Sequence, residues 1–328
     1  MRFAVNPTRR NLLALGTALL ATPALAQAPW APDRPVNFLG PFAAGGAFDL
    51  TARAMARGME PLLGQPVAVV NRTGAGGTIM LAELARARPD GLTIGLLSVN
   101  TNAIAPQLTE VAFDPVGDFT PILTYGSFTT FVAVPRNSPI TGLREMMEQA
   151  RRAPNSLNVG VSAIGSNAHL TMARLTSQER AEVTFVPFGG GAPAVTALLG
   201  GHVHCAVVSG EILPSVRDGT LRLIAVLNAQ RAPEFPDVPT LLDLNYGWAA
   251  NPWLGVGGPK NLPPSIVARY GEVMRRAMET EGFRTSMSTL AIARLDLGPA
   301  ETATLMAESL AEHAQLARAL RIGRFAPR

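Results

Sequence analysis

The stretch Pro41-Phe42-Ala43-Ala44-Gly45-Gly46-Ala47-Phe48-Asp49 decides the fold prediction. It follows a short apolar run at residues 36–40 and leads into residues 49–63, whose apolar side chains have helical spacing. Glycines let the backbone approach a ligand closely, and free N–H groups at a helix start favour an anion. The spacing matches neither a dinucleotide-binding fingerprint nor a phosphate loop with its lysine. The stretch therefore predicts a strand, a glycine loop that can hold an anion, and a helix.

Asp49 is the unusual member of this loop, because a carboxylate there repels an anionic ligand. Two roles remain open for it: capping the helix, or contacting a hydroxyl or ammonium group of the ligand.

Three more glycine loops repeat the same pattern, at residues 71–78, 162–169 and 187–193. In the second of the four loops, Arg72 either clamps a carboxylate or forms a structural ion pair. The pattern predicts strands at 36–40, 67–70, 92–97, 157–161, 183–186, 203–208 and 221–227, and helices at 49–63, 77–88, 142–152, 166–176, 192–199, 264–280, 282–290 and 299–319. Strands that alternate with helices of this length are typical of parallel sheets in an α/β fold.

Two sheets fit this pattern better than one, since a single doubly wound sheet of about ten strands is unusually wide. Residues 123–134 and 247–258 are extended and rich in aromatic, Gly and Pro residues, so we interpret them as crossovers between two domains. The predicted limits are 27–127 with 255–328 for a discontinuous first domain, and 128–254 for an inserted second domain. In such an architecture the ligand lies in the cleft between the domains.

The first 26 residues have the pattern of an export signal. Arg9 and Arg10 precede an apolar run, and Ala24-Leu25-Ala26 supplies the small residues that a signal peptidase needs. The pair of arginines favours the twin-arginine route, while general secretion stays open. We expect cleavage near Ala26/Gln27 and a mature protein in the periplasm.

Composition excludes several classes of protein. The chain has 328 residues, of which 47% are hydrophobic and 16% are charged, and this composition excludes intrinsic disorder. Because Cys205 is the single cysteine, an intrachain disulfide is also excluded. Every basic residue except Lys260 is arginine. Three arginines precede residue 27, which leaves 25 basic against 24 acidic residues in the mature chain. We therefore expect no nucleic-acid partner.

The motifs resemble those of a known family over essentially the whole mature chain. They are Arg34-Pro35-Val36, Pro41-Phe42-Ala43-Ala44-Gly45-Gly46 with Asp49, Leu63-Gly64-Gln65-Pro66-Val67, Asn71-Arg72-Thr73-Gly74-Ala75-Gly76-Gly77, Pro89-Asp90-Gly91-Leu92-Thr93, Phe113-Asp114-Pro115 with Asp118-Phe119, Gly165-Ser166 with His169-Leu170, Val186-Pro187-Phe188, Ala192-Pro193-Ala194 and Leu198-Leu199-Gly200-Gly201-His202-Val203. The family is that of the substrate-binding receptors of tripartite tricarboxylate transporters, also called Bug receptors.

The resemblance implies an α/β, two-domain periplasmic-binding-protein (Venus flytrap) fold with parallel-rich sheets, which closes on a small organic carboxylate. It also implies delivery of that ligand to the membrane permease subunits of a tripartite tricarboxylate-type transporter by a monomeric receptor. A receptor of the same fold that signals to a sensor kinase is the alternative. The residues expected to bind the ligand are Phe42, Ala43, Gly45, Gly46, Ala47, Asp49, Gly76, Gly77, Asn100, Ser162, Gly165, Ser166, Asn167, His169 and Ser209.

The chain departs from the family pattern at three places. Ala44 stands where the family usually has Pro, Ala168 where it has a small polar residue, and Val207-Val208-Ser209 where many members have polar residues. These departures suggest a ligand less polar than a tricarboxylate.

Catalysis, a metal and a cofactor are not expected. Ser166 and His169 lie on one helical turn without an evident orienting acid. His202 and His204 alternate along a strand without a third ligand nearby, and His313 lies among Glu308, Glu312 and Gln315, as on a solvated helix face. Trp248 and Trp253 flank a crossover and either pack in the core or line the cleft.

Overall fold

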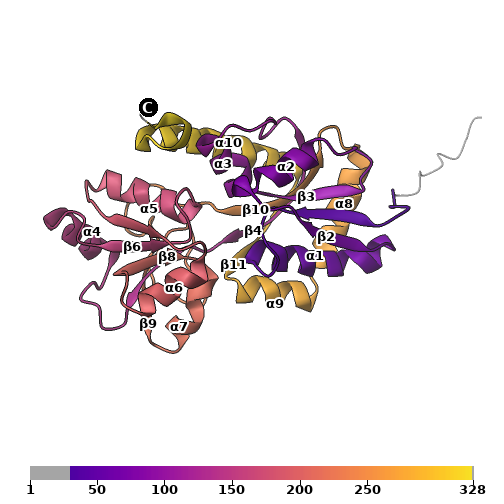
Figure 1. Ribbon diagram of the computed structural model, residues 1–328. Helices are drawn as coiled ribbons and strands as arrows, with labels where there is room; N and C mark the ends of the chain where they lie inside the picture. The colour runs from indigo at the N-terminus through magenta and orange to yellow at the C-terminus, as the bar shows by residue number, and fades with distance from the viewer. Residues whose placement is uncertain (1–29, 327–328) are drawn as a thin grey trace, which may run out of the picture. The chain divides into compact units, whose positions relative to one another are not determined.

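Two mixed β-sheets organise the computed structural model, which describes residues 30–326 (Figure 1). By its contacts the chain from residue 31 onward is one compact unit, to which the helices and strands of the described residues belong. The predicted signal peptide, residues 1–26, lies outside the described residues.

The first lobe contains a six-stranded sheet of order β11-β4-β10-β3-β1-β2. Both ends of the unit contribute to it, since β10 and β11 come from the C-terminal part of the chain. Its strands are β1 (Val36–Gly40), β2 (Val67–Asn71), β3 (Thr93–Ser98), β4 (Phe119–Phe128), β10 (Trp253–Pro259) and β11 (Ile292–Leu297). Its helices are α1 (Ala47–Leu63), η1 (Ala75–Gly77), α2 (Thr78–Ala85), η2 (Val99–Ile104), α3 (Ala105–Leu108), α8 (Pro264–Met278), α9 (Glu281–Thr289), α10 (Pro299–Leu320) and η4 (Gly323–Phe325).

The second lobe contains a five-stranded sheet of order β7-β6-β8-β5-β9. Its strands are β5 (Phe131–Pro135), β6 (Asn158–Val161), β7 (Thr184–Pro187), β8 (Cys205–Val208) and β9 (Leu221–Val226). Its helices are α4 (Leu143–Arg152), α5 (Asn167–Gln178), α6 (Gly191–Leu199), η3 (Gly210–Ile212) and α7 (Leu213–Arg217).

Helices cover both faces of each sheet. In the first lobe α1 packs against α8 and α9, while α10 and α2 lie on the other face (Figure 1). In the second lobe, alternate residues of β5 enter two different cores. Val132 and Val134 pack with the buried methionines of α4, whereas Phe131 and Ala133 pack with Leu198 of α6. This alternation is the two-residue period of a strand that is covered on both faces.

The expectation of parallel-rich sheets needs correction, because antiparallel pairs slightly outnumber parallel ones. The pairs β1–β2, β1–β3, β6–β7 and β6–β8 are parallel, as strand–helix–strand units require. The antiparallel pairs are β10–β3, β10–β4, β11–β4, β5–β8 and β5–β9. The chain leaves the first lobe along β4 and returns along β10 in the opposite direction, so these crossover strands pair antiparallel.

The crossovers are themselves mostly strand. Only Thr129 and Thr130 separate β4 from β5, and the return from β9 to β10 spans residues 227–252. Sequence reasoning missed β11, the π-helical turn η2, and the short elements α3, η3 and α7. Within residues 30–326, no helix is both long enough and apolar enough to span a membrane.

Candidate functional site

The first glycine loop joins β1 to α1 and leaves the start of that helix without a side-chain cap. Gly46 is the N-cap residue in extended conformation, and no side chain accepts a hydrogen bond from the first turn. Gly45 has a φ of +82°, a conformation that favours glycine. The N–H groups of this first turn are therefore available to an anion, which a helix start favours by about 0.3–1 kcal/mol when exposed.

The buried Asp49 carboxylate holds the first glycine loop in place through hydrogen bonds. Its carboxylate accepts hydrogen bonds from Gly45 N–H at 2.9 Å, from Asn71 Nδ2 at 3.0 Å and from Arg53 Nε at 2.9 Å. Asn71 also donates to the Phe42 carbonyl at 2.8 Å. Burial by itself raises the pKa of Asp49, but the bonds from Arg53, Gly45 and Asn71 outweigh it and hold the pKa below its usual value. Because both oxygens are engaged, the structure favours an anchoring role for Asp49 over ligand contact.

The second glycine loop is pressed against η2. Gly77 has a φ of +93°, and a Cβ placed there would lie 2.5 Å from Thr101 Cγ2 and 2.9 Å from Pro41 Cβ. Glycine is thus required both by conformation and by space, and it brings the first two loops together. Gly76 lies beside Ala105. Arg72 pairs with Glu83 at 2.7 Å on the surface, which is the structural ion pair among the two predicted alternatives.

The third glycine loop opens α5 in the second lobe. Ser166 is the N-cap and accepts a hydrogen bond from His169 N–H at 3.2 Å. The Gly165 N–H donates to His169 Nδ1 at 3.1 Å, which leaves the imidazole proton on Nε2. Burial lowers the pKa of His169, so its ring is neutral at pH 7. Its imidazole also packs edge-on against Phe185.

Two amide oxygens lie buried without a hydrogen-bond partner where the lobes meet. They are Oδ1 of Asn167, on the first turn of α5, and Oδ1 of Asn100, in η2. Helix α5 packs against η2, and a Cβ on Gly165 would meet Leu108 of α3 at 2.4 Å. The structure therefore brings η2 and the third loop together across the lobes.

All the predicted site residues except Ser209 fall within a set that we call the glycine-loop face: residues 41–49, 72–78 and 162–169 together with η2. Ser162 directly follows β6, and Ser209 directly follows β8. These strands run parallel with Val161 opposite Val207, so both serines lie at the carboxyl ends of neighbouring strands. Sequence reasoning missed Thr101 and Leu108, which seat the second and third loops. The only feature of the sequence that points to either residue is the glycine that packs against it, Gly77 for Thr101 and Gly165 for Leu108. Arg72, already paired, is the one cationic side chain in the three loops, so backbone N–H groups are the donors for an anion.

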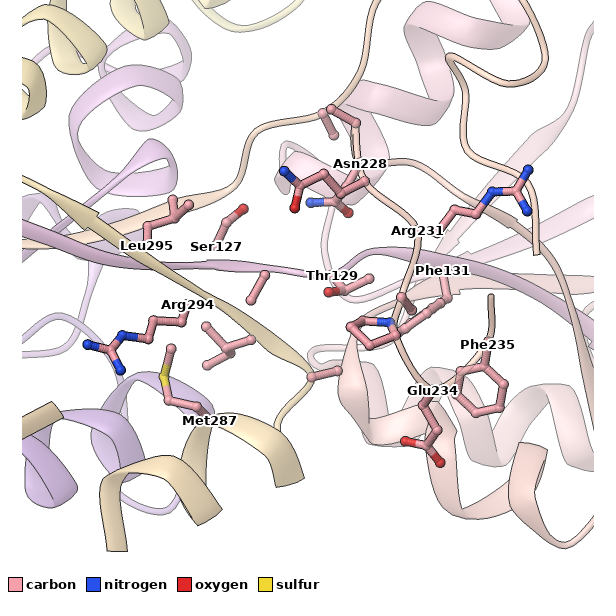
Figure 2. A pocket seen from close by; sticks show the side chains of 18 of the residues that line it. Ser127, Thr129, Phe131, Asn228, Arg231, Glu234, Phe235, Met287, Arg294 and Leu295 are labelled. Atoms are coloured by element: carbon pink, nitrogen blue, oxygen red, sulfur yellow. The ribbon is translucent and has the colours of Figure 1, made fainter. Parts of the chain in front are cut away.

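A cavity of about 650 Å³ lies elsewhere, beside the crossovers, and none of the predicted site residues lines it (Figure 2). We call it the hinge cavity. It is lined by the end of β4, by residues 228–235 and 249–251, and by residues 287–295 of α9 and β11. No glycine loop and no start of a helix of eight residues or more lines the hinge cavity. We therefore place anion binding at the glycine loops.

The histidines do not form a catalytic or metal-binding arrangement among the described residues. His169 accepts from Gly165 N–H and leaves the Ser166 hydroxyl unactivated. His204 Nδ1 accepts from Asn158 N–H at 2.9 Å. The prediction for His313 is wrong: it is 8% exposed, and its Nδ1 lies 2.8 Å from the Ser309 carbonyl. Within residues 30–326, no three His, Cys, Asp or Glu side chains are placed to share a metal ion.

The tryptophans pack rather than line the glycine-loop face. Trp253 is fully buried and its indole N–H donates to Ser309 Oγ at 2.9 Å. Trp248 donates to Gln178 Oε1 at 2.7 Å, and the Arg174 guanidinium lies over its ring.

Comparison with known proteins gives a consistent result. Residues 51–322 match the family model described as the tripartite tricarboxylate transporter family receptor. The chain is 32% identical to Protein BugT of Bordetella pertussis over 304 residues, which is 89% of this chain and 92% of the relative.

Solved structures agree. MatC from Rhodopseudomonas palustris with bound malate is 29% identical, with a TM-score of 0.74 over 87% of this chain and 99% of that one. A second R. palustris protein, solved with adipate, is 26% identical, with a TM-score of 0.78 over 89% of this chain and 99% of that one. The periplasmic binding protein BugD is 28% identical, with a TM-score of 0.75 over 89% of this chain and 99% of that one, so the chain has the two-domain periplasmic-binding-protein fold.

Proposed function

Because the chain belongs to the tripartite tricarboxylate transporter receptor family, we propose that it captures a small organic carboxylate outside the cytoplasm and delivers it to a tripartite tricarboxylate-type permease. In this proposal it is a monomer that is exported by residues 1–26. Its two moving bodies have the predicted limits, 27–127 with 255–328 and 128–254.

One observation carries the proposal: glycine loops of both lobes start helices without side-chain caps, and two buried amide oxygens, on η2 of one lobe and α5 of the other, have no hydrogen-bond partner. The three helices of eight residues or more that follow the first, second and fourth glycine loops, α1, α2 and α6, each begin at a glycine without a side-chain cap. Helix starts attract the carboxylate through N–H groups, while Asn100 and Asn167 accept hydrogen bonds from a hydroxyl or a protonated group of the ligand. The sets of groups are complementary and suit a hydroxy-carboxylate or a partly protonated dicarboxylate.

The test is calorimetric titration with malate and adipate of the wild type and of a Gly46→Leu variant. A side chain is tolerated at Gly46, because its φ is −78° and its Cβ would lie 3.5 Å from the Ala43 carbonyl oxygen. The bulky side chain nevertheless obstructs the approach of a carboxylate to the first turn. Gly282→Leu is the matched control, since a Cβ there meets nothing within 4 Å.

We expect at least one of the two acids to bind the wild type and the control equally, and Gly46→Leu to bind it at least tenfold more weakly. Equal affinity in all three proteins would remove the first glycine loop from the site. A cell that lacks this protein should also lose uptake of the ligand. Normal uptake together with a lost transcriptional response would instead indicate a receptor that signals to a sensor kinase.

A further inference from the structure

The hinge cavity lies on the opposite side of the crossover strands from the glycine loops. The loops leave β1, β2 and β6, toward the β2 and β7 edges of the two sheets. The cavity instead touches β11 and the segment after β9, which are the opposite edges. The strands β4, β5 and β10 run between these two regions, so a ligand in the cavity cannot share the glycine-loop face.

The walls of the hinge cavity are mainly apolar and come from both lobes. Met287, Ile292 and Leu295 belong to the first lobe, and Phe131, Leu213 and Phe235 to the second. Figure 2 shows Met287 and Leu295 at one end of the cavity and Phe235 at the other. A volume of about 650 Å³ is within the range of small-molecule sites, which are mostly apolar with a few polar groups. Methionine in such a wall adapts to guests of different shape.

Two buried hydroxyl groups provide polar groups. Ser127 and Thr129 are 7% and 8% exposed and line the cavity; Ser127 lies on β4, and Thr129 directly follows it. Neither hydroxyl has a hydrogen-bond partner among residues 30–326. Asn228, which also lines the cavity, is already occupied: its Oδ1 accepts from Thr130 N–H and its Nδ2 donates to the Phe128 carbonyl, both at 2.8 Å. Gln230, Asn251 and Ser288 also line the cavity but are exposed, so the hydroxyls of Ser127 and Thr129 are the buried groups that a guest can use.

The charged residues that line the hinge cavity each form an ion pair with a side chain of opposite charge. Arg231 pairs with Asp243 at 2.8 Å, and Glu234 receives two hydrogen bonds from Arg217. Arg294 pairs with Glu279. Since each charge has a partner of opposite sign, no cation is left to hold a carboxylate in this cavity.

We propose that the hinge cavity is a second binding site, for a small uncharged molecule with an apolar body and one hydroxyl group, such as an alcohol or a phenol. The apolar body contacts both lobes, and its hydroxyl exchanges hydrogen bonds with Ser127 and Thr129. The site shares no residue with the carboxylate site in the proposed function.

The experiment uses 2-naphthol as the probe on the mature protein, with naphthalene and 2-naphthoate as matched compounds. Protein labelled with 13C at the methionine methyl groups reports where the probe binds. Met287 lines the cavity, whereas Met147 is buried in the core of the second lobe. We expect the Met287 resonance, assigned with a Met287→Leu variant, to move with saturation at one equivalent of bound probe while Met147 stays unchanged.

The hydroxyl pair is tested with a Ser127→Ala, Thr129→Val double variant, which removes both hydroxyls and keeps the size of each side chain. We expect 2-naphthol to bind the double variant about 2- to 12-fold more weakly, as the loss of a hydrogen bond implies. Naphthalene should bind both proteins equally, and 2-naphthoate should bind the wild type more weakly than 2-naphthol does. Thermal unfolding of the variant confirms that it is folded.

The Gly46→Leu variant separates this site from the carboxylate site, since it should bind 2-naphthol as the wild type does. An unmoved Met287 resonance would overturn the proposal of a site in the cavity. Equal loss of naphthalene and 2-naphthol in the double variant, or tighter binding of 2-naphthoate, would overturn the assigned chemistry.

Discussion

Replacing Asp49 by Asn should lower the free energy of unfolding by about 2–3 kcal/mol, the contribution of about one hydrogen bond to a charged group. The carboxylate is 2% exposed and accepts from Gly45, Asn71 and Arg53. Asparagine keeps the shape but turns one acceptor into a donor, so one of these N–H groups then faces another N–H group. The partner Arg53 is 41% exposed, so its share of the loss is small.

Urea denaturation at pH 7 measures this loss, and Arg53→Gln is the control. Arg53→Gln removes the exposed partner and leaves the bonds from Gly45 and Asn71 in place. We expect it to cost less than about 1 kcal/mol, which is typical of an exposed ion pair. A control as destabilised as Asp49→Asn would show that the ion pair, and not the loop anchor, provides the stability.

The pH dependence of the free energy of unfolding identifies the Asp49 carboxylate as the group that provides the stabilisation. The folded-state pKa of Asp49 is below its usual value, so the stabilisation is fully present above the unfolded pKa of about 3.9. It is lost as the pH falls through the lower folded pKa. The gap between the wild type and Asp49→Asn should therefore be constant from pH 7 to about pH 5 and shrink in stronger acid. Equal stability at pH 7, or a gap that widens in acid, would refute the anchoring role.

Three further predictions concern other parts of the chain. Tyr125→Phe removes the hydroxyl that lies 3.1 Å from Thr51 Oγ1, and should cost about 1 kcal/mol in urea denaturation. Burial lowers the pKa of His169, so its stabilising contribution is present above the unfolded pKa of about 6.5 and is lost as the pH falls toward the folded value. His169→Asn should therefore lose less stability than the wild type between pH 7.5 and pH 5. Replacing Arg9 and Arg10 by Lys should leave precursor in the cytoplasm by immunoblot of cell fractions; normal export of mature protein would indicate general secretion.

Several strands were predictable from the sequence. The strand predicted at residues 36–40 is identical to β1, in which every residue except Asn37 is buried. β11 escaped prediction since Ile292 is its only fully buried residue, so its sequence shows no apolar run. Strand direction was not predictable either: the pairing of β4 with β10 depends on where a distant segment returns.

The face of α10 that carries His313 is buried, but the hydrophobicity pattern does not reveal it because most of its residues are polar. The buried residues of α10 are Thr302, Met306, Ser309, His313 and Ala317, at helical spacing. Only two of the five are apolar, so a hydrophobicity pattern does not reveal the face. The polar members are satisfied locally, as in the bond of Trp253 to Ser309. The uncapped glycine loops, in contrast, were visible in sequence because glycine at a strand–helix junction has few other uses.

The crossover region limits how the two lobes can move. β4 and β5 are each paired within a sheet, so bending on the outgoing side is restricted to Thr129 and Thr130. Asn228 of the return segment binds the residues on either side of Thr129, through the Phe128 carbonyl and the Thr130 N–H. Any rotation of the lobes must therefore turn about these two hydrogen bonds of Asn228. Since Thr129 and Asn228 also line the hinge cavity, a guest there contacts the pivot itself. If the guest changes the affinity of the glycine loops for the carboxylate, the carboxylate must change the affinity of the cavity for the guest by the same factor, because coupling between two sites is reciprocal.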